Sequence, residues 1–105
     1  MNELIKGTLR SVILKLLTDR NKLYGYEITQ TVLEMTGGRL RLTFGALYPV
    51  LHKLEAEGIL RSENETVGNR IRKYYSLTPA GRKEAGKKIT EFRDYLDTMK
   101  NIFAP

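Results

Sequence analysis

The sequence predicts a mainly α-helical fold that carries one small β-hairpin. Apolar residues recur at helical spacing in four segments, and two short runs flank a turn made of glycine and asparagine. No stretch rich in Pro, Gly and Ser divides the 105 residues. Because a chain of this length buries roughly 60 to 68% of its unfolded surface, it needs no disulfide or metal to fold. We expect one folded domain over residues 1–78, followed by a helix over residues 79–105.

The first two helices are predicted over residues 3–18 and from Tyr24 to about Met35. The apolar face of the first is too wide for one neighbour, so we expect it to pack on two sides, one of them facing a second subunit. That face consists of Leu4, Ile5, Leu9, Val12, Ile13, Leu16 and Leu17. In the second helix Ile28 and Val32 repeat the spacing, and Gly37-Gly38 ends it.

A third helix is predicted to begin after Thr43, a favourable N-cap, and to end at Gly58, a favourable left-handed C-terminal cap. Before it, residues 39–42 are predicted to form a short strand. One stripe of this helix is apolar and must be buried; it consists of Leu47, Val50, Leu51 and Leu54.

A second face of the third helix holds donors, an aromatic ring and a cation but no acid, which suits docking on an anionic surface. It consists of Gly45, Tyr48, Pro49, His52 and Lys53. Tyr48 lies about 110° round the helix from the apolar stripe, where its phenol could bind a phosphate or a base edge. The alternatives are that Tyr48 is a core aromatic and that His52 is simply an exposed polar residue.

Two antiparallel strands are predicted over residues 59–66 and 70–77, joined by Val67-Gly68-Asn69. Alternation in the second strand predicts one packed side, consisting of Ile71, Lys73, Tyr75 and Leu77. The other side would keep its guanidinium groups in water and consists of Arg70, Arg72, Tyr74 and Ser76.

The positive charge is concentrated around this hairpin. Residues 61–88 hold eight cations and three acids, a net +5 of the total +6. A surface that binds phosphates concentrates one sign of charge, whereas a generic solvated surface mixes both. Arg72 and Lys73 could instead be ordinary strand cations, and Lys73 could lie on the packed side of the strand.

The last helix is predicted to begin with Thr78 as its N-cap and Pro79 at its first position. Its apolar residues step by four and three, the 3.5-residue period of a coiled-coil seam; they are Ala85, Ile89, Phe92, Leu96, Met99 and Phe103. Such a narrow seam needs another helix, either the same helix or the first helix of a second subunit. We therefore expect a homodimer.

Several classes of function are disfavoured. Without cysteine the chain has no thiolate zinc site and no cysteine nucleophile, and His52 is its single histidine. No pattern places a serine beside that histidine. We expect no enzyme, no metal and no cofactor. The absence of a signal sequence and of an apolar run near ~20 residues predicts no membrane partner and a cytoplasmic location.

Helix, helix, recognition helix and two-stranded wing, in this order, make a winged helix-turn-helix. Within that layout the chain resembles the PadR-like transcriptional regulators from about Leu9 to Arg82. The resemblance rests on four successive motifs, namely Tyr24-Gly-Tyr-Glu-Ile, Gly45-Ala-Leu-Tyr-Pro, Leu51-x-x-Leu54-Glu55-x-x-Gly58-Ile59 and Arg72-Lys-Tyr-Tyr-x-Leu-Thr-x-x-Gly81.

The resemblance implies a prokaryotic dimeric repressor, associated with the nucleoid when bound, whose recognition helices enter successive major grooves of a pseudo-palindromic operator. Its wings would grip flanking phosphates or the minor groove. The implied DNA-binding residues are Thr43, Gly45, Tyr48, His52 and Lys53 at the groove and Arg70, Arg72 and Lys73 on the wing. Many members place Thr or Ser where this chain has Ala46, and the chain resembles the short subfamily with one C-terminal helix.

The expected dimer interface consists of Leu9, Val12, Ile89, Phe92, Tyr95, Leu96, Met99 and Phe103. Two interpretations stay open: these side chains pack closely as a dimer core, or they line a chamber between subunits that admits a flat hydrophobic effector. Two other functions also stay open. The chain could be a basic protein that binds RNA or the ribosome, or a winged helix that binds only protein.

Overall fold

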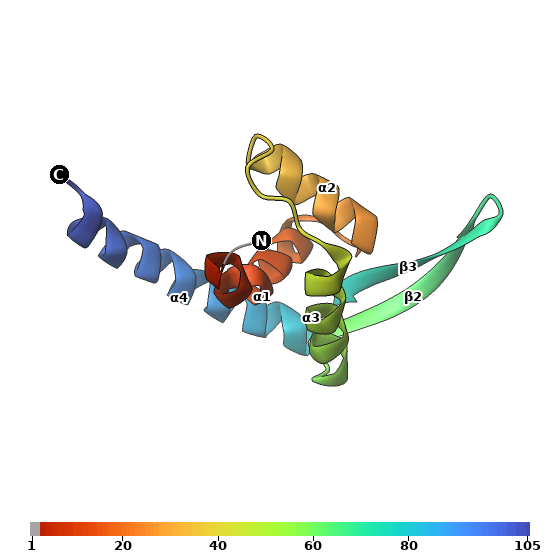
Figure 1. The fold of residues 1–105 in the computed structure, drawn as a ribbon. Coiled ribbons are helices and arrows are strands. Elements are labelled where there is room, and N and C mark those ends of the chain that lie inside the picture. Colours follow the sequence, from red (N-terminus) through yellow and green to blue (C-terminus); the bar gives the residue numbers. More distant parts are fainter. Residues whose placement is uncertain (1–2) are drawn as a thin grey trace.

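The computed structural model describes residues 3–105 and confirms a mainly helical fold with a β-hairpin (Figure 1). The elements are α1 (Glu3–Asp19), β1 (Leu23–Tyr24), α2 (Gly25–Met35), α3 (Phe44–Ala56), β2 (Leu60–Val67), β3 (Arg70–Leu77) and α4 (Pro79–Phe103). The far part of α4 and the tip of the hairpin project from opposite ends, so the molecule measures 54 × 31 × 21 Å.

The core surrounds α1, which contributes Ile5, Leu9, Ile13, Leu14, Leu16 and Leu17. The apolar stripe of α3 packs into this core as predicted, with Leu47, Leu51 and Leu54 buried and Val50 at its edge. Two residues of the first helix differ from the prediction. Leu14, which was left out of the apolar face, is fully buried, and Leu4 is 79% exposed.

The sheet has three strands in the order β1-β3-β2, all antiparallel. β1 was not predicted, because its pairing joins Leu23 to Tyr75 and Tyr24 to Tyr74 across some 50 residues of chain. The strand predicted over residues 39–42 is wrong: this segment forms no strand, and it anchors the chain by burying Leu42 in the core.

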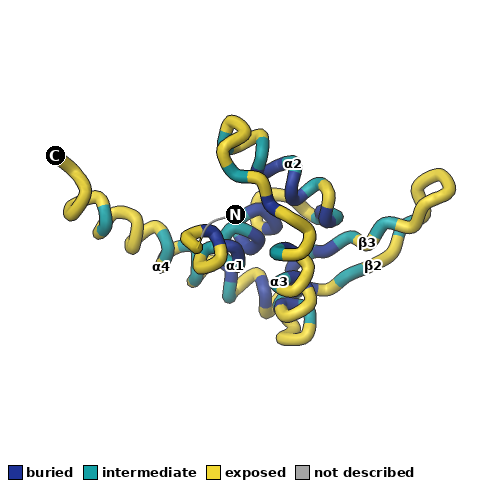
Figure 2. Tube along the Cα trace, viewed as in Figure 1, coloured by how far each residue is buried: buried dark blue, intermediate teal, exposed yellow. Residues whose placement is uncertain are grey.

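The predicted packed side of β3 is correct only at the base of the hairpin. Tyr75 and Leu77 are buried, but Ile71 is 72% exposed and Lys73 is also exposed. The physical reason is length, because the outer half of the hairpin extends past the core and has exposed residues on both faces (Figure 2).

The predicted caps are confirmed. The Thr43 hydroxyl oxygen accepts from the Ala46 amide at 3.2 Å, and Gly58 ends α3 with a φ of 76°. At the start of α4 the Thr78 hydroxyl oxygen accepts from the Gly81 amide at 2.9 Å and donates to the Gly58 carbonyl at 2.6 Å. These bonds fix α4 against the end of α3.

Candidate nucleic-acid interface

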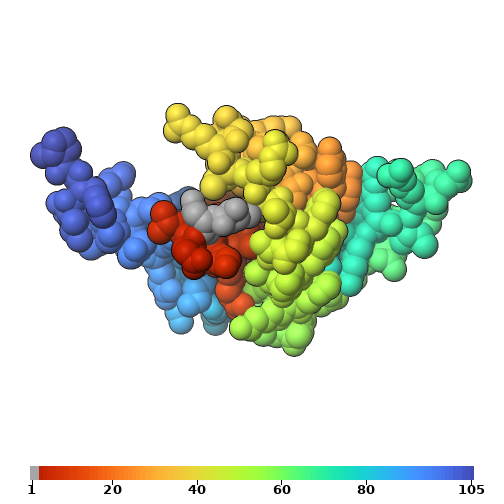
Figure 3. Space-filling model, viewed as in Figure 1, coloured from red at the N-terminus to blue at the C-terminus, as the bar shows by residue number. Residues whose placement is uncertain are grey.

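Three ring side chains lie in a row along the exposed face of α3. The Phe44 and Tyr48 ring centroids are 5.6 Å apart, and those of Tyr48 and His52 are 6.0 Å apart. Tyr48 is 37% exposed, so it is not a core aromatic, and contact of its phenol with DNA stays a prediction. Thr43, Gly45, His52 and Lys53 are exposed on the same helix or at its start, and Figure 3 shows α3 along the front of the molecule between α1 and the hairpin.

Gly25 explains why Tyr48 lies where it does. A Cβ atom at this position would be 2.6 Å from the Tyr48 hydroxyl oxygen, closer than van der Waals contact allows. Only glycine therefore lets the phenol of α3 approach the first turn of α2. There the Tyr24 amide donates to the Glu27 carboxylate at 3.1 Å, which closes the start of α2.

Arg72 is held in place by two tyrosines. Its guanidinium carbon lies 4.6 Å from the centroid of the Tyr24 ring, a cation–π contact. A side-chain hydrogen bond with Tyr74 raises the pKa of Arg72 above its usual value, so its positive charge is secure. The Tyr24 and Tyr74 rings themselves meet edge to face at 5.3 Å. The half-buried Arg72 is thus a preorganised cation.

Lys73 points to the other face of the hairpin. Its ammonium group lies 3.6 Å from a Glu55 carboxylate oxygen on α3 and 5.5 Å from the centroid of the buried Tyr75 ring. Burial raises the pKa of Tyr75, so this phenol stays neutral. Lys73 is therefore partly neutralised by Glu55, whereas Arg70 makes no ion pair within residues 3–105.

A groove of about 440 Å³ brings several of these side chains together. We call it the aromatic groove; it is lined by Tyr24, Gly25, Tyr26, Tyr48, Arg70, Ile71, Arg72 and Lys73. It unites Tyr48 of α3 with the three wing cations predicted from the sequence. Thr43, Gly45, His52 and Lys53 do not line it and lie along α3 outside it.

Sequence reasoning missed the aromatic residues that complete this surface. Phe44 and Tyr26 are large exposed side chains, and Tyr24 supports Arg72. The available signal was the pair of tyrosines that flank Gly25, which was interpreted as part of a family motif and, for Tyr24, as the start of a helix. Their contact with β3 depends on strand β1, which the sequence did not reveal.

A second surface is apolar and lies beside the packed helices α1 and α4, with the end of α2 and the loop after it on its other side. A cavity of about 320 Å³, the apolar cavity, is lined mainly by Val12, Leu16, Val32, Met35, Leu40, Ile89, Phe92 and Leu96. A neighbouring hollow of about 480 Å³ involves Leu96, Met99 and Phe103. Tyr95, which precedes Leu96 in α4, is exposed and does not line it. Leu9 differs from the other expected interface residues: it is only 3% exposed and packs in the core of its own chain.

Two further observations concern membrane spans and metal sites. No helix in residues 3–105 has the length and apolar character that a membrane span requires. Over the same range no three acidic or histidine side chains gather at a place that could hold a metal ion.

Comparison with known proteins identifies relatives along nearly the whole chain. The model of the transcriptional regulator PadR-like family matches residues 13–87. Transcriptional regulator Rv3488 of Mycobacterium tuberculosis is 42% identical over 99 residues, covering 94% of this chain and 85% of that protein. These relatives are regulators, so the expectation that the chain is not an enzyme is confirmed.

Solved structures agree with this fold. A transcriptional regulator from Clostridium thermocellum has a TM-score of 0.84 and 28% identity, covering 99% of this chain and all of that one. Bacillus subtilis PadR in complex with operator DNA has a TM-score of 0.67 and 32% identity, covering 75% of this chain and 45% of that one. The predicted winged helix-turn-helix is confirmed.

Proposed function

Because the chain belongs to the transcriptional regulator PadR-like family, we propose that it binds operator DNA as a homodimer and represses transcription in the prokaryotic cytoplasm. The observation that supports DNA binding is the aromatic groove, in which Tyr48 of the recognition helix and the wing cations Arg70 and Arg72 face one space. The relative from Bacillus subtilis, crystallised on its operator, supports the same proposal.

Different side chains have different parts in this proposal. Arg70 and Arg72 bind phosphates, which sets affinity and register but reads no sequence. Tyr48, His52 and Lys53, exposed along α3, reach base edges in the major groove, and Thr43 and Gly45 lie at the end of α3 that approaches the backbone. Lys73 contributes less to phosphate binding, because Glu55 offsets its charge.

Residues 1–78 form the DNA-binding part of this proposal, and residues 79–105 form the dimerisation helix. The exposed part of α4, with Tyr95, Leu96 and Phe103, would pack against the second subunit. The apolar cavity supports an additional proposal of a flat hydrophobic effector, since its volume of about 320 Å³ falls within the roughly 300 to 1,000 Å³ of small-molecule sites. An effector bound there would change how α4 packs against α1 and the second subunit, and so release DNA.

The salt dependence of DNA affinity tests the part assigned to the wing. Each phosphate neutralised by a cation contributes about −0.9 to the slope of log K against log salt concentration. We expect Arg70→Ala and Arg72→Ala each to flatten the slope by about 1 and to weaken binding to all sequences alike. His52→Ala is expected to keep the slope and change the sequence preference.

The matched control is Lys83→Ala, which removes an exposed cation on α4, outside the aromatic groove. Fluorescence anisotropy with a labelled duplex between 50 and 200 mM salt measures all four variants. Equal slopes for the wild type and both arginine variants would show that the wing arginines do not bind DNA phosphates.

A further inference from the structure

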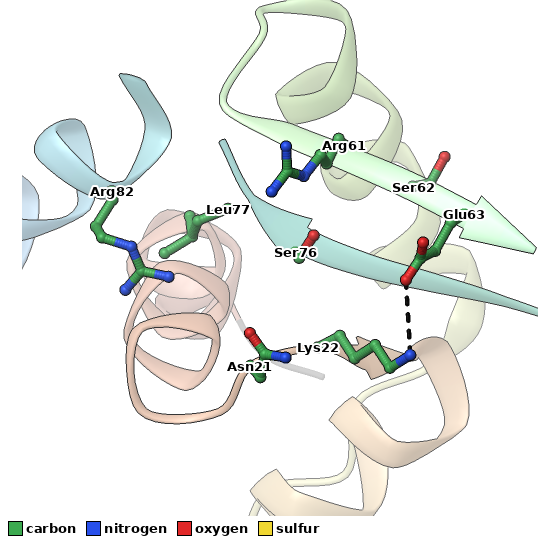
Figure 4. Close-up of a pocket in the computed structure, with 8 residues that line it drawn as sticks. All are labelled: Asn21, Lys22, Arg61, Ser62, Glu63, Ser76, Leu77 and Arg82. Atoms are coloured by element: carbon green, nitrogen blue, oxygen red, sulfur yellow. Dashed lines mark ion pairs between the residues drawn. The ribbon is translucent and has the colours of Figure 1, made fainter. Parts of the chain in front are cut away.

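A polar pocket of about 260 Å³ lies between the base of the hairpin, the turn after α1 and the start of α4 (Figure 4). Register places Arg61 opposite Ser76 and Glu63 opposite Tyr74, so these residues share one face of the sheet. The other face carries Ser62, whose hydroxyl donates to Glu55 of α3 at 2.5 Å. The polar pocket therefore opens on the side of the sheet away from the recognition helix.

Two arginines from different elements line this pocket. Figure 4 shows Arg61 of β2 and Arg82 of α4 on either side of Leu77. Neither guanidinium forms an ion pair with any residue in the described chain, 3–105. Asn21 and Ser76 add a neutral amide and a hydroxyl to the same space.

The one carboxylate in the pocket is already occupied. Glu63 lies 3.6 Å from the ammonium group of Lys22, which also bonds Glu65 of β2. The hydrogen bond with Glu65 is the main cause of the raised pKa of Lys22, so this lysine stays charged. Lys22, Arg61 and Arg82 face Glu63 and the neighbouring Glu65, so three cations against two acids give a local net charge of +1, and the two arginines carry the unpaired charge.

We propose that this pocket binds a small phosphate-class oxyanion, either inorganic phosphate or the phosphate group of a small molecule. The two planar guanidinium groups match the oxygens of a tetrahedral anion, and the Asn21 amide and Ser76 hydroxyl donate to those that remain. The volume is below the roughly 300 Å³ at which sites for larger organic ligands begin, which favours a compact anion. This inference goes beyond the proposed DNA binding.

Binding there would connect parts of the chain with different proposed roles. Arg61 and Ser76 belong to the base of the wing, Arg82 to the first turns of α4, and Asn21 to the turn that precedes β1. An anion bridging Arg61 and Arg82 would remove their mutual repulsion and tie the wing to the proposed dimerisation helix. Phosphate should therefore raise the unfolding temperature of the full chain.

The test uses inorganic phosphate and the full-length protein, with chloride at equal ionic strength and pH as reference. Titration calorimetry and thermal unfolding compare the wild type, the double variant R61Q/R82Q, and the control K83Q/K87Q, which removes the same charge from α4 outside the pocket. We expect R61Q/R82Q to weaken phosphate binding at least about tenfold and the control to bind like the wild type. Absence of binding by the wild type, or equal weakening in both double variants, would overturn the proposal.

A second experiment distinguishes a pocket that binds a free anion from one that binds phosphates of the DNA backbone. The salt slope of duplex binding is expected to be the same for R61Q/R82Q as for K83Q/K87Q. A slope flattened by about 2 in R61Q/R82Q alone would mean that the pocket holds DNA phosphates, and the inference of a free ligand would be wrong. Because phosphate binding is measured without DNA, failure of the proposed function would leave this result standing.

Discussion

Leu96→Glu is expected to abolish the homodimer and to weaken operator binding by about 10²- to 10⁴-fold, while each chain stays folded. Leu96 is 46% exposed in the single chain and touches both the apolar cavity and the neighbouring hollow. A carboxylate at this position stays in water in the monomer, but the proposed dimer would bury it without a partner, at a cost of several kcal/mol. Without the second subunit, the protein loses the gain in operator affinity that comes from binding two half-sites at once.

The control is Thr90→Glu, which adds the same charge to an exposed position about 120° round α4 from Leu96. Sedimentation equilibrium at micromolar concentration measures the assembly, and anisotropy with operator DNA measures the affinity. We expect the control to remain dimeric and to bind like the wild type, apart from a small loss from the added charge. A dimeric Leu96→Glu variant would show that α4 is not the interface.

Gly81→Ala is expected to destabilise the fold by at least about 3 kcal/mol, since overpacking of a rigid site costs typically 1–3 kcal/mol and occasionally more. A Cβ atom at Gly81 would be 1.9 Å from the carbonyl oxygen of Ile59. That oxygen is backbone and accepts from the Thr78 amide at 3.1 Å, so no side-chain rotation relieves the clash. The first turn of α4 would have to separate from the end of α3.

The matched control is Gly86→Ala on the same helix, where an added Cβ meets nothing within 4 Å. Because alanine is the better helix former, this change should stabilise the chain by roughly 0.5–1 kcal/mol. Thermal unfolding at equal protein concentration should therefore show a decrease of roughly 12 °C or more for Gly81→Ala and an increase for Gly86→Ala. Similar melting temperatures for Gly81→Ala and the wild type would contradict the close approach of α3 and α4.

Local signals predicted most of the fold. The helices have strong periodic patterns, and the caps at Thr43, Gly58 and Thr78 act within a few residues of chain, so their prediction needed no tertiary information. Long-range pairing explains why one strand was missed. Strand β1 exists because β3 offers a free edge to Leu23 and Tyr24, and no local pattern encodes that edge.

In the candidate site, too, local sequence patterns predicted some features, whereas others depend on contacts between distant segments. Helical spacing was sufficient to place Tyr48 and His52 on an exposed face of α3, as the structure has them. Strand alternation separated Arg72 from Lys73, but the partners that distinguish these cations, Tyr24 and Glu55, come from other elements. Which wing cation stays available therefore depends on packing that only the folded chain reveals.

Hydroxyl-radical footprinting of the dimer on a genomic fragment selected by the purified protein tests most directly whether two copies of α3 read one duplex. Recognition helices about 34 Å apart protect two related half-sites whose centres are roughly 10 bp apart, arranged as a pseudo-palindrome. We expect that pattern with the wild type and its loss with Leu96→Glu. One asymmetric protected site, bound equally well by the monomeric variant, would contradict the account.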